Sequence, residues 1–459
     1  MAAKKGGRRI TGLETEYGCL VTPTKESLAT LHRIRDWIFE NRRYGLIDLH
    51  GRDWEEPPGN GGFLFNGGRL YMDMGHIEYC TAECASVVDV VRQDRAGDSI
   101  LQEAIRALGL GERAQFIRNN IDHRSGATFG CHENYSLLRQ APLTEPNVLS
   151  LLTFLTLRLL FTGAGRVGGV KGGQGGTSAE AIPNEETPDF QITQRADFIQ
   201  NDFYEWVQHN RAIINTRDEP LADPRLYRRL HLLHGDTNVL PSALFLKVGA
   251  TRLVLDLLEC DDLPPSILAD AVGTLRRLSH QPAPPWRVPM ADGSMADAVE
   301  ALSEFRQRAV GRFRGRDAET DEILGLWKRV EQGLQSNLSS LVGVVDWVTK
   351  QHLLDAFRAS ENLEWGDPWL EAQDLEYHHV DPERSLGLAL ADRSGSWAEG
   401  GEPTDATLVP PADTRAKARS DAMHGFAAVS APYELDWHYV QQEGSAPLMM
   451  LDPFKTTVV

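Results

Sequence analysis

The sequence predicts an α+β fold with an antiparallel sheet, divided into one large domain and a smaller one. Strand-like and helix-like segments follow one another without the strict strand–helix–strand order of a parallel sheet. The chain has 459 residues, more than one ordinary small domain needs, so it can bury a large core. Its content of 41% hydrophobic and 24% charged residues is typical of a soluble globular protein.

Residue periodicity predicts the elements in chain order. Residues 8–22 are expected to form a strand, and residues 25–42 an amphipathic helix. Residues 45–68 are rich in Gly, Pro, Asp and Glu, so we expect mainly a loop there. A second strand is expected at 69–74, followed by a helix at 86–108. Further strands are expected at 113–122, 209–216, 228–234 and 243–248, and further helices at 147–161, 263–279, 295–312 and 319–340.

The charge balance argues against two classes of partner. A net charge of −18 disfavours non-specific attraction to nucleic acid or to an anionic membrane surface. The most apolar run, 148–161, is short for a bilayer and contains Arg158, so we expect a buried helix. The first residues lack an apolar stretch of signal-peptide length. We therefore expect no nucleic-acid partner and no membrane span, and any anionic ligand must meet a local basic site.

The cysteines indicate a reducing compartment. There are five, an odd number scattered through a large chain, which suits free thiols and a cytoplasmic location. Cys80 and Cys84 could form half of a zinc site, but no matching Cys or His pair completes four ligands. A zinc site is therefore not expected.

The segment GAGRVGGVKGGQGGTS, at 163–178, invites comparison with a phosphate-binding loop. Backbone N–H groups in such a run can surround an anion. However, Lys171 is preceded by Val170 and followed by Gly172, so the Walker pattern is absent. A mobile surface loop is the better interpretation, and residues 393–416 are similarly loop-like.

The stretch LYMDMGHIEYCTAEC, at 70–84, combines apolar and chemically reactive side chains. Side chains alternate between the two faces of a strand, so Leu70, Met72 and Met74 would face the core. The same rule places Glu14 and Glu16 of GLETEYG on one face of the first strand. If the two strands lie near each other in one sheet, their polar faces form one concave surface. We expect that surface to hold Glu14, Glu16, Arg69, Tyr71, Asp73 and Glu78, the last from the turn after Gly75.

The converging carboxylates predict a divalent cation. Acidic groups without matching positive charges repel one another unless a cation lies among them. Oxygen ligands suit Mg²⁺ or Mn²⁺, and Mg²⁺ held by carboxylates usually partners the phosphates of a nucleotide. The alternative is a solvated sheet face lined by acids. For the whole cluster, the separation of apolar from polar residues by strand parity favours the cation site.

Two further motifs leave alternatives open. GCHENY, at 130–135, places His132 in what looks like a polar turn, where a lone histidine is more often structural. It is not a zinc-protease helix, because position 136 is Ser. INTRDEP and RRLHLLHGDTN contain arginines whose fork geometry suits phosphate or carboxylate, or alternatively ion pairs with the acids nearby. The candidate site residues are Arg217, Arg228, Arg229, His231 and Asp236, and the possible ion-pair partners are Asp218, Glu219 and Asp223.

Taken together, these motifs resemble one known family. RRITGLETEYG, NGGRLYMDMGHIEYCTAEC, NNIDHRSGATFGCHENY, GAGRV, IINTRDEP, YRRLH, GDTN, LDW and LDPF are similar to segments of the Pup ligase and Pup deamidase/depupylase family. These enzymes are relatives of glutamine synthetase and γ-glutamyl-cysteine ligase. The motifs run from residue 8 to residue 454 in family order, so the resemblance covers essentially the whole chain.

The resemblance implies a fold and an activity. It implies a glutamine-synthetase-like catalytic domain at 1–385, in which a curved antiparallel sheet packed by helices forms a cradle, and a small C-terminal domain at 386–459. In the ligase branch, ATP phosphorylates the side chain of the C-terminal glutamate of a Pup-like small protein modifier. A lysine of a target protein then attacks the γ-glutamyl phosphate, and the isopeptide bond tags the target for the proteasome pathway.

The resemblance also implies roles for particular residues. The expected cofactors are ATP and Mg²⁺. The implied magnesium ligands are Glu14, Tyr71 and Glu78, the implied ATP contacts are Arg69, Thr81 and Trp437, and the implied catalytic base is Asp73.

The motifs favour the ligase branch over the depupylase/deamidase branch. LETEYG, CTAEC, GCHENY, GAGR and LDPF resemble the ligases more closely. The spacing of five positions from Asp73 to Glu78 and the segment FQITQRADFI resemble the depupylases instead. Thr237, where either branch would have alanine, and the glycine-rich run at 167–176 resemble neither. A ligase is the prediction, a depupylase or deamidase is the alternative, and the modifier is Pup or a related tag.

Overall fold

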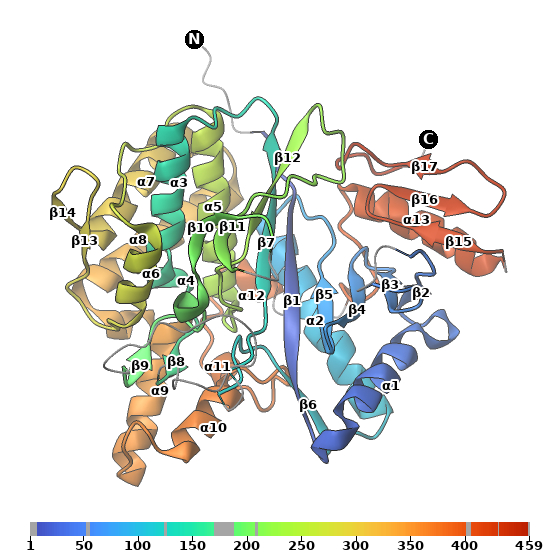
Figure 1. The fold of residues 1–459 in the computed structure, drawn as a ribbon, viewed down its shortest axis with the longest axis horizontal. Helices are drawn as coiled ribbons and strands as arrows, with labels where there is room; N and C mark the ends of the chain where they lie inside the picture. Colours follow the sequence, from blue (N-terminus) through green and yellow to red (C-terminus); the bar gives the residue numbers. More distant parts are fainter. Residues whose placement is uncertain are drawn as a thin grey trace.

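One large sheet lies at the centre of the structure, a computed structural model (Figure 1). Its strands are β1 (Thr11–Val21), β2 (Gly45–Ile47), β3 (Gly61–Leu64), β4 (Arg69–Asp73), β5 (His76–Cys80), β6 (Ala114–Ile117), β7 (Cys131–Leu138), β10 (Asn201–Tyr204), β11 (Ala212–Asn215) and β12 (Tyr227–Leu232). Their order is β10-β11-β12-β7-β1-β5-β4-β3-β2, with β6 paired to the far end of β1. The residues described are 7–51, 56–123, 126–168, 188–206, 210–400, 405–429 and 431–457.

The sheet is antiparallel except where β10 runs parallel to β11. The longer helices are α1 (Ser27–Phe39), α2 (Val87–Ala107), α3 (Glu145–Leu157), α5 (Pro241–Glu259), α6 (Ala271–Ser279), α7 (Ala298–Phe313), α8 (Ala318–Ser336), α9 (Asp346–Glu361), α10 (Pro368–Tyr377) and α13 (Arg415–Ala428). Short ones are α4 (Leu159–Thr162), α11 (Leu386–Ala389) and α12 (Trp397–Gly400). The predicted α+β class with an antiparallel sheet is therefore confirmed.

Helices α1, α2, α3 and α5 pack on the apolar face of the sheet, whereas α13 packs on Phe63 on the opposite face. Along β1 the residues alternate, with Leu13 and Tyr17 buried and Glu14 and Glu16 partly exposed. Leu13 belongs to a core cluster with residues of α2, α3 and α5, and Tyr17 to a second cluster with residues of α1 and α2. Along β1, the opposite face carries the acids.

Residues 243–248, predicted as a strand, lie inside α5, so this prediction is wrong. Nearly every residue of α5 is buried, including Ala243, Leu246 and Val248. A helix that is buried on all sides is apolar on all sides, so periodicity cannot distinguish it from a buried strand. The usable signal was Pro241, because proline is favoured in the first turn of a helix.

Three other stretches differ from the prediction. The expected helix at 263–279 begins only after its N-cap Asp270, whose side chain accepts a hydrogen bond from Gly273 N–H. The supposed polar turn GCHENY lies in β7, a central strand, and Glu78 lies in β5 rather than in a turn. The expected loop at 45–68 includes β2 and β3, where glycines allow the strands to approach closely: a Cβ on Gly61 or Gly62 would collide with the neighbouring backbone.

The C-terminal region forms a separate small layer. A sheet of β15 (Tyr433–Leu435), β16 (Tyr439–Gln442) and β17 (Leu448–Met449) packs with α13. Figure 1 shows this unit on the other side of β1 from α5–α8. Trp397 of α12 packs instead on Phe245 of α5, with ring centroids 5.5 Å apart. The domain boundary at 385/386 stays a prediction.

Two smaller hairpins complete the described structure. β8 (Arg166–Val167) pairs with β9 (Phe190–Gln191), and β13 (Arg287–Pro289) with β14 (Met295–Asp297). Most of the predicted glycine-rich loop, including Lys171, lies outside the described residues, as does 401–404 of the second predicted loop. Among the helices that the structure describes, none has the length and apolar character needed to span a membrane.

Candidate active site

The register of β1, β5 and β4 brings the predicted acidic residues into one row. Glu16 on β1 is opposite Glu78 on β5, and Glu78 is opposite Tyr71 on β4. Directly opposed residues of paired strands point to the same side of a sheet. Asp73, two positions after Tyr71, lies on that side as well. We call this side of the sheet the cradle face.

A second row lies one step along the strands. Glu14 on β1 is opposite Cys80 on β5, which is opposite Arg69 on β4. On its other side, Glu14 is opposite His132 on β7. The prediction that two separate strands present their polar residues on one surface is therefore confirmed, with β5 lying between them.

Glu78 is the centre of an acidic cluster on the cradle face. Carboxylate oxygens of Glu16, Asp73 and Glu78 all lie within 4.8 Å of one another. The hydroxyl of Tyr71 donates a 2.6 Å hydrogen bond to Glu78. Burial, together with the charges of Glu14, Glu16 and Asp73, raises the pKa of Glu78 well above its usual range. A carboxyl in these surroundings is stabilised by a proton or by a cation.

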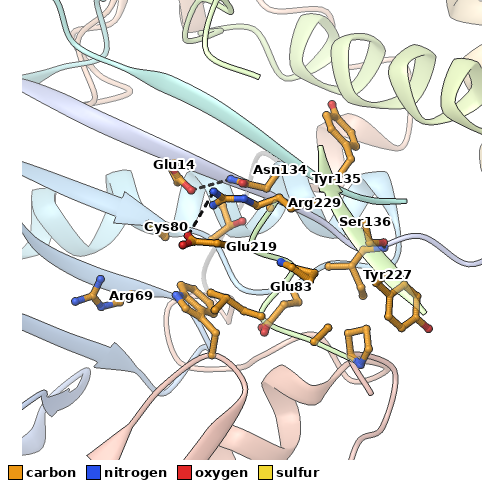
Figure 2. A pocket seen from close by; sticks show the side chains of 18 of the residues that line it. Glu14, Arg69, Cys80, Glu83, Asn134, Tyr135, Ser136, Glu219, Tyr227 and Arg229 are labelled. Atoms are coloured by element: carbon orange, nitrogen blue, oxygen red, sulfur yellow. Dashed lines mark hydrogen bonds and ion pairs between the residues drawn. The ribbon is translucent and has the colours of Figure 1, made fainter. Parts of the chain in front are cut away.

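Glu14 is held by polar partners from β7 and β12. Asn134 donates a 2.7 Å hydrogen bond to Oε1 of Glu14 (Figure 2), and Nδ1 of His132 lies 3.0 Å from Oε2. Nε2 of His231 lies 3.7 Å from the same oxygen. Burial would raise the pKa of Glu14, but the hydrogen-bonded His132 and the nearby His231 hold it well below its usual range. Glu14 is therefore a fixed, ionised carboxylate.

A cavity of about 470 Å³ opens beside this array (Figure 2). It lies between the cradle face, the segment 217–229 and the C-terminal unit. Of the predicted site residues it brings together Glu14, Arg69, Tyr71, Thr81 and Trp437. Asp73 and Glu78 are not on its lining and lie further along the cradle face, in the acidic cluster.

The three predicted nucleotide contacts differ in their surroundings. Arg69 forms a 2.6 Å ion pair with Glu56, and its guanidinium lies over the ring of Tyr71. The side-chain oxygen of Thr81 accepts a 3.0 Å hydrogen bond from Leu13 N–H. Trp437 makes an edge contact with Phe63, with ring centroids 5.1 Å apart.

Glu83 also lines this cavity (Figure 2), where it binds the C-terminal unit. Its carboxylate accepts hydrogen bonds from Arg415 at 2.7 Å and from Arg419 at 2.5 Å, both on α13. Arg419 also lies over the ring of Trp437, 4.8 Å from its centroid. Burial opposes ionisation, but the two arginines lower the pKa of Glu83 to about 2. This ion-pair cluster fixes one wall of the cavity.

The basic residues of the segment 217–229 contribute to the same cavity. Arg217, Arg228 and Arg229 line it. Arg217 donates a 2.7 Å hydrogen bond to Glu219, and Arg229 lies 3.8 Å from the same carboxylate (Figure 2). The interpretation as ion pairs is therefore confirmed, whereas binding of phosphate by these cavity-lining arginines stays a prediction.

Sequence reasoning did not recognise His132, Asn134 and His231 as parts of one array. The alternation in CHENYSLL, buried then partly exposed, was the signal that could have found β7. It was hidden because Glu133 occupies a buried position. Arg158, between α3 and α4, neutralises Glu133 with a 2.6 Å ion pair, and no local pattern connects these two residues.

Acids on one face of an antiparallel sheet, beside a cavity with arginines, are typical of enzymes that handle the phosphates of a nucleotide. The family model described as Pup-ligase protein matches residues 9–441. The chain therefore belongs to the Pup-ligase protein family. Its fold is that of the solved ligase PafA in complex with the prokaryotic ubiquitin-like protein Pup, with a TM-score of 0.82 and 30% identity, covering 98% of this chain and 90% of that one.

Other relatives include both branches of the family. A Pup--protein ligase of Nakamurella multipartita is 31% identical over 98% of this chain and 97% of its own length. A depupylase of Acidothermus cellulolyticus is 34% identical over 93% of this chain and 90% of its own. PafA solved in complex with ADP matches with a TM-score of 0.76 and 30% identity, covering 88% of each chain.

Proposed function

We propose that this chain is an ATP-dependent ligase that joins the C-terminal glutamate side chain of a Pup-like modifier to a lysine of a target protein. The observation that carries the proposal is the cradle face, where Glu14, Glu16, Asp73 and Glu78 converge beside the cavity. Family membership and the ligase PafA, solved with Pup and with ADP, support it. The product would direct the target to the proteasome pathway.

The residues of the cradle face fit a magnesium ion. Burial and repulsion from the neighbouring acids raise the pKa of Glu78, and a divalent cation among the carboxylates would remove that repulsion. Glu14 and Glu78 would hold the ion, with the Tyr71 hydroxyl beside them. When bound, Mg²⁺ would neutralise phosphate charge during phosphoryl transfer.

The cavity is the proposed nucleotide site. Trp437 offers an aromatic surface for a base or a ribose, and Arg69 and Thr81 lie on the lining near Glu14. The phosphates would therefore extend from the C-terminal unit toward the cradle face. Positive charge along the same cavity comes from Arg217, Arg228 and Arg229. Because the chain has a net negative charge, such a local basic site is needed to bind the phosphates of a nucleotide.

Asp73 is the proposed base. A lysine must lose its proton before it can attack a γ-glutamyl phosphate, and a carboxylate within reach accepts that proton. Asp73 ends β4 at the acidic cluster, beyond the cavity lining, where an incoming lysine can approach. The phosphate leaves as the lysine nitrogen forms the new amide bond.

The depupylase remains the second candidate, because the Acidothermus cellulolyticus relative has that name. The five-position spacing from Asp73 to Glu78 has a local cause: Asp73 pairs with His76 across a two-residue turn. Both turn residues, Met74 and Gly75, have positive φ, as this tight hairpin requires.

A gel assay separates the two activities. The wild type with ATP, Mg²⁺, a modifier ending in glutamate and a lysine-bearing protein should form a conjugate, with about one ADP per bond. In parallel, purified conjugate is incubated with the same enzyme. Rapid cleavage without any conjugate formation would overturn the ligase proposal.

A cytoplasmic location is part of the proposal. All five cysteines are free thiols in the structure, as expected in a reducing compartment.

A further inference from the structure

The cradle face ends at the hairpin between β4 and β5. Asp73, the last residue of β4, is opposite His76, the first residue of β5. Directly opposed residues point to the same side of a sheet, so the imidazole of His76 lies next to the carboxylate of Asp73. Both residues are partly exposed. A substrate can therefore reach the proposed base from this end of the cradle face.

The loop that joins β6 to β7 covers the neighbouring part of β1. It lies on the side of β1 away from β5, because Glu14 pairs with β5 on one side and with β7 on the other. Gly18, on the cradle face of β1, leaves room for this loop, since a Cβ there would lie only 3.0 Å from Oδ1 of Asn119. The ring of Phe129, from the same loop, reaches across β1 to His76 in an edge contact, with 4.8 Å between the ring centroids.

His76 and Phe129 form an aromatic wall next to Asp73, which we call the ring pair. Only 8% of Phe129 is exposed. Its backbone is fixed by Asn120, whose carbonyl oxygen accepts from Phe129 N–H at 3.0 Å and whose Nδ2 donates to the Phe129 carbonyl oxygen at 2.9 Å. The ring pair is therefore held in place by the chain itself.

Met74, at the tip of the hairpin, departs from two local rules. The sequence predicts that it faces the core with Met72, and this prediction is wrong: 76% of Met74 is exposed, against 5% of Met72. Its φ is 41°, in the left-handed region that Asn, Asp and Gly adopt most readily in such a turn. A bulky apolar residue at this position does not help the hairpin to form, so its side chain is available for a partner.

A lysine that gives its proton to Asp73 must place its nitrogen there, so its stem has to lie along the neighbours of Asp73. Along β4 the cradle face is occupied, because the Tyr71 hydroxyl donates to Glu78 and its ring lies under Arg69. The open direction leads over the ring pair to the hairpin tip. An extended lysine side chain is about 6 Å long, roughly two residues of strand, so the target backbone would pass close to Met74.

We propose that the ring pair and Met74 form the binding surface for the target lysine, with the stem packed on the two rings, the nitrogen beside Asp73 and the target backbone over Met74. The inference rests on the proposed function and adds a basis for selecting lysine over shorter amines. The four methylenes of lysine gain apolar contact with the rings while the charged end meets the acid. A shorter side chain loses part of that contact and leaves its nitrogen short of Asp73.

The test uses three amine acceptors. One is a short peptide with a single lysine, and the second is the same peptide with ornithine, which is one methylene shorter. The third is hydroxylamine, which has no stem: its nitrogen displaces the phosphate of the γ-glutamyl phosphate and forms a hydroxamate. Product formation is measured with saturating ATP, Mg²⁺ and a modifier ending in glutamate.

The variants are Met74→Asn, His76→Ala and Phe129→Leu, and melting temperatures are recorded for all proteins. Met74→Asn gives the turn a residue that it favours, so this variant should keep or gain stability. Its control is Met295→Asn, because Met295 is 51% exposed on the β13–β14 hairpin, at the opposite side of the molecule from β4 (Figure 1). The control for Phe129→Leu is Phe116→Leu, which removes a comparable edge contact in the core beneath the helices.

The wild type should prefer the lysine peptide to the ornithine peptide by roughly tenfold in kcat/KM. In His76→Ala and Phe129→Leu that preference should fall below about threefold, because the surface that recognises the stem is gone. Met74→Asn should raise the KM for both peptides by about threefold to tenfold and keep the preference, since it contacts the backbone. Hydroxamate formation should stay within about threefold of the wild type in all three variants. Both controls should treat every acceptor as the wild type does.

An unchanged preference for lysine in both ring-pair variants would overturn the inference. A raised KM for the modifier with an unchanged KM for the peptides would also overturn it, and would assign this surface to the modifier.

Failure of the ligase proposal gives a different result, in which the wild type forms neither conjugate nor hydroxamate. The same variants then cleave preformed conjugates joined through lysine or through ornithine, because the departing amine leaves from the place where the incoming one would bind. A preference for the lysine conjugate that depends on the ring pair would support this site, and equal cleavage of both conjugates by every protein would overturn it.

Discussion

Glu78 and Glu83 are five residues apart and almost equally buried, with 4% and 7% of each residue exposed, yet their carboxyls behave in opposite ways. Burial and the charges of neighbouring acids raise the pKa of Glu78. Burial acts on Glu83 too, but Arg419 and Arg415 outweigh it and lower the pKa to about 2. Burial alone therefore does not distinguish a functional carboxylate from a structural one.

The difference lies in what neutralises each charge. Glu83 is neutralised within the chain by Arg415 and Arg419, so its ion pairs stabilise the contact between the segment after β5 and α13. Among the described residues, Glu78 has a tyrosine hydroxyl and a thiol as hydrogen-bond partners and no cationic side chain within ion-pair distance. The acidic cluster around Glu78 therefore lacks a neutralising positive charge from the described residues. This is the physical basis for proposing a metal ion there.

The largest expected effect is on conjugation, through Asp73 in the acidic cluster around Glu78. Asp73→Asn keeps the shape of the side chain and removes its basic character, so conjugation should fall by roughly 10²- to 10⁴-fold. Affinity for Mg-ADP should stay within about threefold of the wild type, because Asp73 does not line the cavity. Single-turnover conjugation and calorimetry measure the two quantities. Retained conjugation would exclude Asp73 as the base.

The next largest effect is on the free energy of unfolding, through the ion pairs of Glu83. Glu83→Gln removes the only negative charge in ion-pair contact with Arg415 and Arg419 among the described residues. Breaking a buried ion-pair cluster from one side should cost about 3–5 kcal/mol of unfolding free energy. Urea unfolding followed by fluorescence measures it. A loss below about 1 kcal/mol, the value of a surface pair, would show that the cluster is not structurally important.

Glu78→Gln is the matched change in the acidic cluster. Unlike Glu83→Gln, it should leave stability intact and weaken ligand binding. Metal-free protein should keep or gain thermal stability, because one of several repelling carboxylates is gone. Mg²⁺-dependent affinity for ADP should fall by at least about tenfold, as expected when one of a few protein ligands is lost. Undiminished affinity, with Glu83→Gln as the control, would remove Glu78 from the metal site.

The two carboxyls also predict opposite pH dependences for the metal-free protein. The native state binds the Glu78 proton more tightly than the unfolded state, so that contribution to stability is full below about 4.5 and is lost as pH rises. The Glu83 contribution is present above about 4.5 and is lost as pH falls toward 2. Melting temperatures over this range should lose the first slope in Glu78→Gln and the second in Glu83→Gln. Identical profiles in both variants would contradict the comparison.

The smallest expected effect is on the KM for ATP, through Trp437 on the cavity lining. Trp437 lines the cavity and Phe426 belongs to the same small core without lining it. Trp437→Ala should raise the KM for ATP by up to about tenfold through lost aromatic contact. Phe426→Ala should lower the melting temperature more and change the KM less. The reverse pattern would make Trp437 a packing residue.

Where the pattern was local, the sequence predicted both fold and site. Strand parity was enough to place Glu14, Glu16, Tyr71 and Asp73 on one face, and β1, β4, α2, α7 and α8 were found from periodicity. These succeed because alternation and the helical repeat depend only on neighbouring residues. Glu78 was placed on the correct face although it lies in a strand and not in a turn.

Where the pattern depended on distant partners, prediction failed. Glu133 interrupts the apolar side of β7, and only Arg158 explains it. No local pattern reveals the structural role of Glu83, because its partners on α13 are more than three hundred positions away. The roles of the individual site residues stay predictions.

The account's central claim is that the acids of the cradle face hold a divalent cation next to the nucleotide. Crystals grown with Mn²⁺ and ADP test it directly, because anomalous diffraction locates manganese without reference to the protein. We predict a peak whose nearest protein atoms, within about 2.5 Å, are carboxylate oxygens of Glu14 and Glu78, with the Tyr71 hydroxyl beside them. Manganese bound with ADP but out of reach of both carboxylates would contradict the account.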